Sequence, residues 1–529
     1  MKKILLFLVA CVATMATYAQ DDLGQTWASS FEPVSESQEI RGVNTTVSAD
    51  GSVYVSSTYN KAFSFGNSEV ADPEGLTSSA IVKYNGKGEE QWAATIFGAA
   101  EIFALTTTAD GTLYAAGHYM DAVICIGTDG EETILDGNGS EYHAFVAKIS
   151  TDGKFEAVKT ITPVVSDAIA NSFMYFPEPG YVYVTPTNIQ VDGDKVYVSA
   201  GFSADVPELG WTASYVNVWD FMYLENKNIG IFSLDKNDLT NATSVAVVQN
   251  SEAISYNQHY AEALNFVAEN GTVYVGFIGF GNLSLTTAAG ASDFSFATTE
   301  EGSLEHAFVL STIATETTNK VFNVSMSDKI YIPFNLFMGD NDDELVIGGT
   351  FHGELPFDRS KAVSSDLPSD IFVATLDKAT GNVNNTYVSG IANTATGMAV
   401  AEGAVILTTA ENGCYEFDFY SAKGEVVSEA IYSAIDARGR VLVYTEDSVI
   451  YVNGFYINSS TPGVIPGVPG DITGDGVVDV ADVTSIVAMI LDESLITDTA
   501  DFNDDGVVNV ADLTHLISII LGTEIEAQK

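Results

Sequence analysis

The stretch Asp50-Gly51-Ser52-Val53-Tyr54-Val55 decides the fold, because the same phrase returns along the chain. An Asp-Gly pair supplies the positive φ that a tight turn needs, and the alternating β-branched and aromatic residues that follow favour a strand. The intervals between copies are about 60 to 80 residues, except for a shorter last one. Clear copies begin at Asp110, Asp192 and Asn270, and weaker copies begin at Asp343, Glu402 and Arg438.

A second apolar phrase follows each of the first six copies and predicts a further strand in each unit. Turns such as Asn85–Gly88 then lead to a last strand such as Gln91–Thr95. Each unit therefore holds about four strands, which is the size of a propeller blade. The second phrase occupies residues 80–84, 144–149, 230–234, 307–310, 371–376 and 415–419.

The number of four-stranded units, and the strand missing from the last of them, predict that the repeats close into a ring. Six units are complete between about residues 41 and 432, and the seventh has three expected strands, near 433–437, 441–445 and 449–453. The missing strand is expected at the other end of the chain, where Gln25–Ser30 resembles Glu90–Thr95. Pairing it with the last unit would cover two sheet edges at once. The fold class is therefore predicted as mainly β, a seven-bladed β-propeller over residues 20–457, with six or eight blades as alternatives. The units resemble the degenerate propeller repeats of exported bacterial proteins.

The composition excludes several classes of function. The 529 residues include 71 Asp and Glu against 21 Lys and Arg, a formal net charge of −50. Such a chain repels nucleic acid and anionic membrane surfaces, and it favours divalent cations where carboxylates converge. Hydrophobic residues at 46% and aromatic residues at 11% supply a packed core, which excludes global disorder.

Residues 1–19 are expected to be a signal peptide. Lys2 and Lys3 precede an apolar run, and Thr17-Tyr18-Ala19 is a small-residue cleavage site before Gln20. A lipoprotein box ending at Cys11 is disfavoured, because only seven residues separate it from Lys3. No later apolar run reaches the roughly 20 residues that span a bilayer. The protein is therefore expected to be secreted or at the cell surface. The remaining cysteines, Cys125 and Cys414, are expected to be buried free thiols.

A Pro/Gly-rich linker, residues 458–469, separates the repeats from a small all-α domain at residues 470–523, with a tail at 524–529. Residues 471–491 return at 501–521, with 11 of 21 positions identical. Each copy opens with a twelve-residue loop that has Gly at position 6, at Gly476 and Gly506, where the chain must turn sharply.

Oxygen donors fall at positions 1, 3, 5, 9 and 12 of each loop, and position 7 offers a backbone carbonyl. A hard cation with about six to eight oxygen ligands requires this arrangement, and calcium tolerates its irregularity better than magnesium. Apolar residues then recur at helical spacing, from Val480 to Leu491 and from Val510 to Leu521. The alternative is a pair of acidic turns that bind nothing. The predicted ligands are Asp471, Thr473, Asp475, Val477, Asp479 and Asp482 in the first loop, and Asp501, Asn503, Asp505, Val507, Asn509 and Asp512 in the second.

This duplicated loop and helix resembles the type I dockerin domain. The resemblance implies two calcium ions, folding upon calcium binding, and docking onto a cohesin-like partner in a complex that degrades polysaccharides. Two features depart from a regular EF-hand: position 12 is Asp, and the linker leaves no helix before the first loop. The partner-reading positions hold Val480-Ala481 and Val510-Ala511, so the cohesins read by clostridial dockerins are not expected to fit. The apolar pair could instead pack against the chain's own propeller.

The sequence does not identify catalytic residues. His143 and His306 precede equivalent Ala-Phe-Val strands, and Ser79 and Asp370 are assigned to the same repeat position, which favours a structural hydrogen bond over catalysis. Aromatic residues in blade insertions could stack on sugars, although core packing is favoured for them. The preferred hypothesis is a secreted binding or scaffolding protein. The alternative is a dockerin-tagged glycoside hydrolase or lyase that acts on a polysaccharide or glycan. The aromatic residues in question are Tyr175-Phe176-Pro177, Tyr215, Trp219 and Tyr223.

Overall fold

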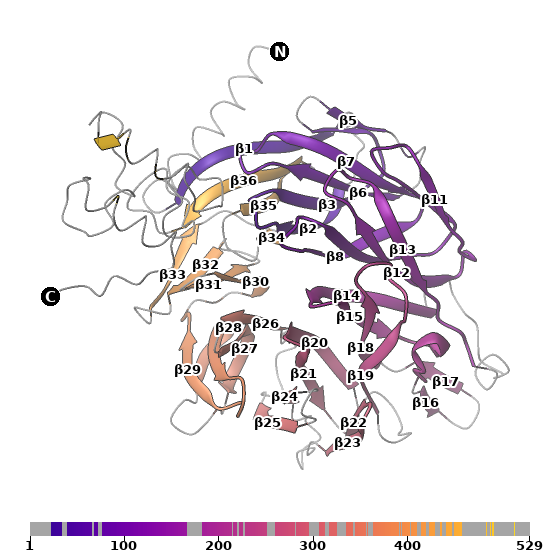
Figure 1. The fold of residues 1–529 in the computed structure, drawn as a ribbon. Helices are drawn as coiled ribbons and strands as arrows, with labels where there is room; N and C mark the ends of the chain where they lie inside the picture. The colour runs from indigo at the N-terminus through magenta and orange to yellow at the C-terminus, as the bar shows by residue number, and fades with distance from the viewer. Residues whose placement is uncertain are drawn as a thin grey trace. The chain divides into compact units, whose positions relative to one another are not determined.

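The computed structural model confirms a mainly β chain (Figure 1). One short 3-10 helix, η1 (Pro207–Leu209), interrupts the strands in the part described. The described residues are 23–33, 40–65, 68–71, 73, 77–166, 182–213, 215–218, 222–225, 228–250, 260–280, 282–295, 306–312, 317–324, 335–341, 344–355, 357, 363–390, 392, 394–401, 404–409, 414–418, 423–428, 434–435, 441–446, 449–457, 483, 487, 489–490 and 513.

The strands form seven meanders, M1 to M7, each a run of four strands. In M1 to M6 the four strands follow one another in chain order, with inserted strands between the second and third of M1 to M4, and neighbouring strands within each meander are antiparallel. M1 is β2 (Ile40–Val47), β3 (Val53–Tyr59), β6 (Ser78–Tyr84) and β7 (Glu90–Phe97); M2 is β8 (Ala100–Thr107), β9 (Leu113–Tyr119), β12 (Glu141–Ile149) and β13 (Phe155–Ile161); M3 is β14 (Val182–Asp192), β15 (Lys195–Phe202), β18 (Asn228–Asp235) and β19 (Thr243–Asn250); M4 is β20 (Tyr260–Glu269), β21 (Thr272–Phe280), β24 (His306–Thr312) and β25 (Thr317–Val324).

The remaining meanders follow the same plan. M5 is β26 (Asn335–Asn341), β27 (Glu344–Leu355), β28 (Val363–Asp377) and β29 (Val383–Val388); M6 is β30 (Ala395–Ala401), β31 (Ala404–Thr409), β32 (Cys414–Asp418) and β33 (Lys423–Ser428); M7 is β34 (Ala434–Ile435), β35 (Val441–Glu446), β36 (Val449–Ile457) and β1 (Leu23–Pro33). In M7 the sheet order places β1 beside β36, so the strand predicted at Gln25–Ser30 does join the last unit.

The repeated phrases occupy fixed places in the meanders. The Asp-Gly phrase forms the turn into the second strand, and the apolar phrase forms the third strand. Gly51, Gly111, Gly193 and Gly271 all have positive φ, between 57° and 79°, as the turns require.

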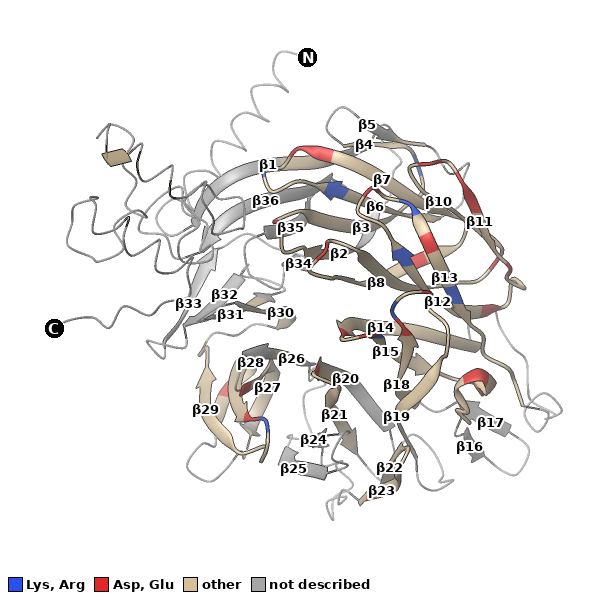
Figure 2. Ribbon diagram, in the orientation of Figure 1, with Lys and Arg blue, Asp and Glu red and all other residues tan. Residues whose placement is uncertain are grey.

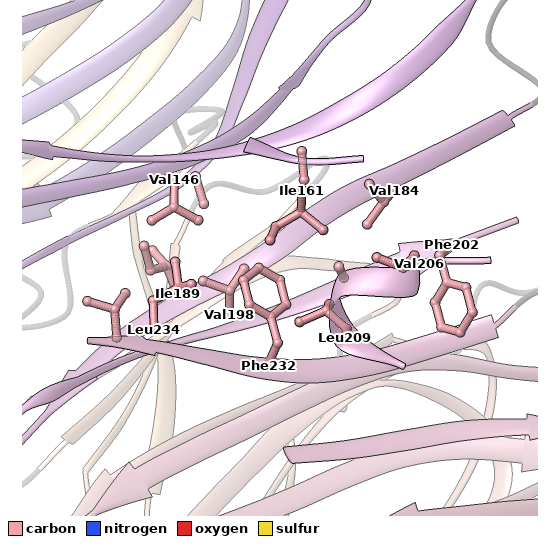
Figure 3. Close-up of a cluster of buried hydrophobic side chains, with 14 of the residues drawn as sticks. Val146, Ile161, Val184, Ile189, Val198, Phe202, Val206, Leu209, Phe232 and Leu234 are labelled. Carbon is pink, nitrogen blue, oxygen red and sulfur yellow. The ribbon is translucent and has the colours of Figure 1, made fainter. Parts of the chain in front are cut away.

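Strands at the centres of M1, M2 and M3 are apolar on both faces, and core clusters pack consecutive meanders from M1 to M6 against one another. All seven residues of β3 are buried, and β6, β9 and β15 are buried almost throughout. Separate core clusters lie between M1 and M2, M2 and M3, M3 and M4, M4 and M5, and M5 and M6. The cluster between M2 and M3 combines Val146 and Ile161 with Val198 and Phe232 (Figure 3). Each such side chain contributes about 1.5–3 kcal/mol by leaving water.

The first strands of successive meanders lie against one another. β2 contacts β8, β8 contacts β14, β14 contacts β20, β20 contacts β26, β26 contacts β30, and β30 contacts β34. β34 also contacts β2. Five of these first strands carry a register shift, which bends a strand and increases its twist. The shifts lie at Arg41/Asn44, Ile102/Ala104, Pro186/Asn188, Glu262/Asn265 and Ala395/Gly397.

Side chains from the repeated phrases join one meander to the next. The Tyr54 hydroxyl donates to the Gly111 carbonyl of M2 at 3.2 Å, and the Tyr114 hydroxyl donates to the Lys236 carbonyl of M3 at 2.9 Å. Lys83 and Lys148, both from third strands, donate in the same direction to the carbonyls of Thr151 and Asn237. The sequence motif therefore encodes inter-meander bonds as well as a turn.

Inserted segments between the second and third strands reach back to the preceding meander. β4 (Phe63–Phe65), with β5 (Ser68–Val70), pairs with β1 of M7; β10 (Val123–Ile126), with β11 (Glu132–Leu135), pairs with β7 of M1; β22 (Asn282–Thr287), with β23 (Gly290–Ser295), pairs with β19 of M3. In M3 the insertion contains η1, whose Glu208 forms an ion pair with Lys159 on β13 of M2. A second hairpin in that insertion consists of β16 (Tyr215–Val218) and β17 (Met222–Glu225).

The Tyr114 bond gives a direct test of inter-meander coupling. Tyr114→Phe removes one hydroxyl that donates across the M2–M3 boundary, so we expect a loss of about 1 kcal/mol and a lower Tm in calorimetry. Tyr197→Phe is the matched control, because Tyr197 occupies the same repeat position and its hydroxyl makes no hydrogen bond to the described residues. Equal melting temperatures for the two variants would contradict the role assigned to Tyr114.

Candidate functional site

The twelve predicted calcium ligands lie outside the described residues, so their donor chemistry rests on the sequence. All side-chain donors in the two loops are oxygens: four carboxylates in the first loop and three in the second, with hydroxyl and amide donors for the rest. This all-oxygen set fits a hard cation such as calcium and excludes the sulfur and imidazole donors of a zinc site. The donor residues of both loops therefore fit calcium, the ion predicted from their spacing.

The helices predicted after the loops are supported at the positions described. Val483, Val487 and Ile490 have helical backbone after the first loop, and Leu513 has it after the second. Their burial differs from the sequence pattern. Met489, which the pattern did not single out, is 8% exposed, whereas Val487, placed on the apolar face, is 38% exposed.

The repeat position of His143 has a structural role. His143 faces Tyr119 across the sheet, and its Nδ1 lies 3.4 Å from the Thr162 hydroxyl, just after the fourth strand of M2. In M5 the carboxylate of Asp370 occupies this position and accepts hydrogen bonds from the Ser389 hydroxyl and the Gly390 amide, just after β29. Both side chains therefore tie the end of the fourth strand to the third, as the structural hypothesis predicted.

The assignment of Ser79 to this position was wrong by one residue. Ser78, not Ser79, faces Tyr59, and it is Ser78 that accepts a hydrogen bond from the Gly98 amide, just after β7. Ser79 instead donates to the Ala100 carbonyl of M2. A one-residue shift reverses the face of a strand, and only the cross-strand register fixes it.

His118 lies in an aromatic cluster between M2 and M3. Its ring stacks on Tyr142 at 3.9 Å and meets the edge of Phe103 at 4.8 Å. Its Nδ1 lies 2.9 Å from the Thr185 hydroxyl of β14. Burial lowers the pKa of His118 from 6.5 to about 4, so the imidazole is neutral at pH 7. Phe103 is the residue that the β8 register shift leaves without a cross-strand partner.

Other candidate residues have simpler roles or fall outside the description. Cys125 is a buried free thiol, as predicted, and burial raises its pKa to about 12, so it is unreactive as a nucleophile. His352 donates from Nδ1 to the Leu367 carbonyl at 2.6 Å. Tyr215 and Tyr223 belong to the β16–β17 hairpin. The signal-peptide residues, Tyr175–Pro177, Trp219, His259 and His515 lie outside the described residues.

Comparison with known proteins identifies the C-terminal module. Residues 469–524 match the family model of the dockerin type I domain. Domains of this family bind calcium and cohesins, and the proteins that carry them are typically extracellular. No curated protein sequence matches the chain. No helix in the described part is both long and apolar enough to cross a membrane.

Several solved structures are similar at low sequence identity. The β-propeller domain of Cps50 (Swd1) from Myceliophteria thermophila is 7% identical, covers 79% of this chain and 99% of its own, and has a TM-score of 0.36. The computationally designed Ika8 protein is 12% identical over 72% of this chain and 93% of its own, with a TM-score of 0.34. BamB from Moraxella catarrhalis is 10% identical over 82% of this chain and 100% of its own, with a TM-score of 0.32.

The depressed pKa of His118 predicts a pH-dependent contribution to stability. Because its folded pKa lies below the unfolded value, the neutral ring favours folding above about pH 6.5, and this contribution is lost as the pH falls toward 4. Between pH 7 and pH 5 we expect the Tm of the natural protein to fall relative to that of His118→Phe, which cannot be protonated. The difference between the two proteins cancels the titration of the many surface carboxylates. A pH-independent difference in Tm would contradict the prediction.

Proposed function

We propose that this chain is an exported assembly protein, in which a seven-bladed β-propeller at residues 20–457 is joined to a calcium-organised docking module at residues 470–523. The single observation that carries the assembly role is the match of residues 469–524 to the dockerin type I domain, over two loops that each present oxygen donors at calcium spacing. A ligand surface on the propeller would then be brought into a larger complex through the module.

The seven-bladed interpretation is supported by the contacts among first strands. Seven meanders of four strands each would serve as blades, and the contact of β34 with β2 connects the seventh to the first. A six-bladed propeller would have no position for the strands of M7. An eight-bladed propeller would need four further strands between M7 and M1. The composition of M7 from both ends of the chain favours the same conclusion, because it covers two edges that would otherwise be open.

The docking partner is proposed to be a cohesin-like protein with an apolar reading surface. Val480-Ala481 and Val510-Ala511 stand where hydroxyl residues read the partner in clostridial dockerins. An apolar pair on the module is complementary to an apolar contact, because small aliphatic side chains offer no hydrogen bond to a polar one. The setting proposed for this assembly is a polysaccharide-degrading or cell-surface complex, with a polysaccharide or glycan as the ligand of the propeller.

Calcium binding by the module is testable on the mature chain. Calorimetric titration with Ca²⁺ is expected to give two ions per chain, and Asp482→Ala or Asp512→Ala is expected to lower this to one, because each removes the position-12 carboxylate of one loop. Asp492→Ala, one residue beyond the first repeat, is the control and should retain both ions. Two ions bound by all four proteins would rule out these loops as the sites.

The partner proposal is tested with a panel of immobilised type I cohesins that includes both polar and apolar reading surfaces. The mature chain is expected to bind a cohesin of the apolar group in Ca²⁺ and to release it in EDTA. Val480→Asp together with Val510→Asp should abolish binding while leaving calcium stoichiometry at two. Retention in EDTA, or unchanged binding by the double variant, would contradict the assignment. If the mature chain binds two calcium ions but no cohesin of the panel, the proposed partner is rejected and the proposed calcium sites are retained.

A further inference from the structure

M7 differs from the other meanders because its strands come from two distant parts of the chain. β34, β35 and β36 lie at residues 434–457, whereas β1 lies at residues 23–33. In the sheet order β1 has a neighbour on each side, with β36 on one side and β4 on the other. At Phe31–Pro33 β1 is therefore not the edge of this sheet, although it is the last strand needed to complete a four-stranded unit.

β4 belongs to an insertion of M1, and its pairing with β1 has a defined antiparallel register. Phe31 faces Phe65, Glu32 faces Ser64 and Pro33 faces Phe63. β5 then covers the opposite side of β4, with Ser64 facing Glu69. The hairpin thus extends the sheet of M7 by two strands and leaves β5 at its edge.

Aromatic side chains anchor this hairpin to M1. Phe63 is fully buried and Phe65 is 2% exposed. The Phe63 ring meets the edge of Tyr59, the last residue of β3, at a centroid distance of 5.1 Å, and it lies 6.3 Å from the Phe65 ring. Because β3 ends at Tyr59 and β4 begins at Phe63, and the rings of these two residues are in contact, M1 positions the hairpin, while β4 pairs with β1 of M7.

The insertion hairpins β10–β11 and β22–β23 pair with a different kind of strand. β10 pairs with β7, and β22 pairs with β19, and in both cases the strand that is covered is already continuous with its own meander. Covering these strands protects a sheet edge, and the acidic turn of β10–β11, at Asp129, Glu131 and Glu132, adds charge there (Figure 2). Of these three described hairpins, β4–β5 alone holds a strand that is remote in sequence from the rest of its meander.

We propose that the β4–β5 hairpin is a lock that holds the N-terminal strand β1 in M7. With β4 in place, the Phe31–Pro33 end of β1 can leave only if two ladders of hydrogen bonds break together, one with β36 and one with β4. Without β4, β1 would be a terminal edge strand that frays from one side, which is the usual behaviour of chain ends that few contacts secure. The lock acts beside β36, the last strand before the linker that begins at residue 458.

Hydrogen exchange by mass spectrometry on the mature chain tests the lock. Ser64→Pro removes a backbone donor from β4 and is incompatible with a strand paired on both sides. We expect amides of β1 and β36 to exchange about tenfold faster, or more, with those of β7 unchanged. Ser64→Ala is the matched control, because it keeps the backbone donor and should exchange as the natural protein does.

Ile124→Pro in β10 supplies the reciprocal control. It should accelerate exchange in β7 and leave β1 and β36 unchanged. If Ser64→Pro does not fold, Phe65→Leu weakens the same hairpin more gently and should accelerate β1 by a smaller factor. Unchanged exchange of β1 in folded Ser64→Pro or Phe65→Leu would overturn the proposal, as would equal acceleration of β1 by Ile124→Pro.

Discussion

A four-stranded sheet that is apolar on both faces cannot be stable alone, and this constraint governs the structure of residues 23–457. Every residue of β3 is buried, so both of its faces need a neighbour. The five core clusters lie between consecutive meanders, and each draws side chains from two of them. A linear stack would still expose one apolar face at each end. In the proposed ring the last meander would cover the first, and the contact of β34 with β2 supports that proposal.

Hydrogen bonds add direction to this apolar packing. Tyr54 and Lys83 from M1 donate to carbonyls of M2, and Tyr114 and Lys148 from M2 donate to carbonyls of M3. The insertions point the other way, since each of the hairpins β4–β5, β10–β11 and β22–β23 pairs with the preceding meander. The M1–M2 boundary has both kinds of connection: side chains of M1 donate to M2, and a backbone ladder from the M2 insertion pairs with M1, which opposes sliding as well as separation.

Local patterns predicted the elements well, and they predicted a non-local pairing only where one strand resembled another in sequence. The Asp-Gly phrase fixes its own turn, because positive φ is a property of the pair, and Gly51 and Gly111 have the expected conformation. The likeness of Gln25–Ser30 to Glu90–Thr95 was sufficient to place β1 beside β36. The pairing of β4 with β1 had no signal, since three-residue strands are too short for periodicity. Ser79 was assigned to the position that Ser78 occupies, because the register depends on pairing between strands. The spacing of donors from Asp471 to Asp482 is local, so the sequence alone could predict a calcium loop there.

The account depends most on the proposed ring, and a spin-label distance measures it directly. Thr46, Thr106, Asp340 and Ile435 occupy one repeat position, each facing the second residue of the next strand in its own meander. Labels are placed in pairs on a background without Cys125 and Cys414, and distances are read by double electron–electron resonance. The ring predicts that the Thr46–Ile435 distance matches the Thr46–Thr106 distance between consecutive meanders. A Thr46–Ile435 distance as long as the Thr46–Asp340 distance would contradict it.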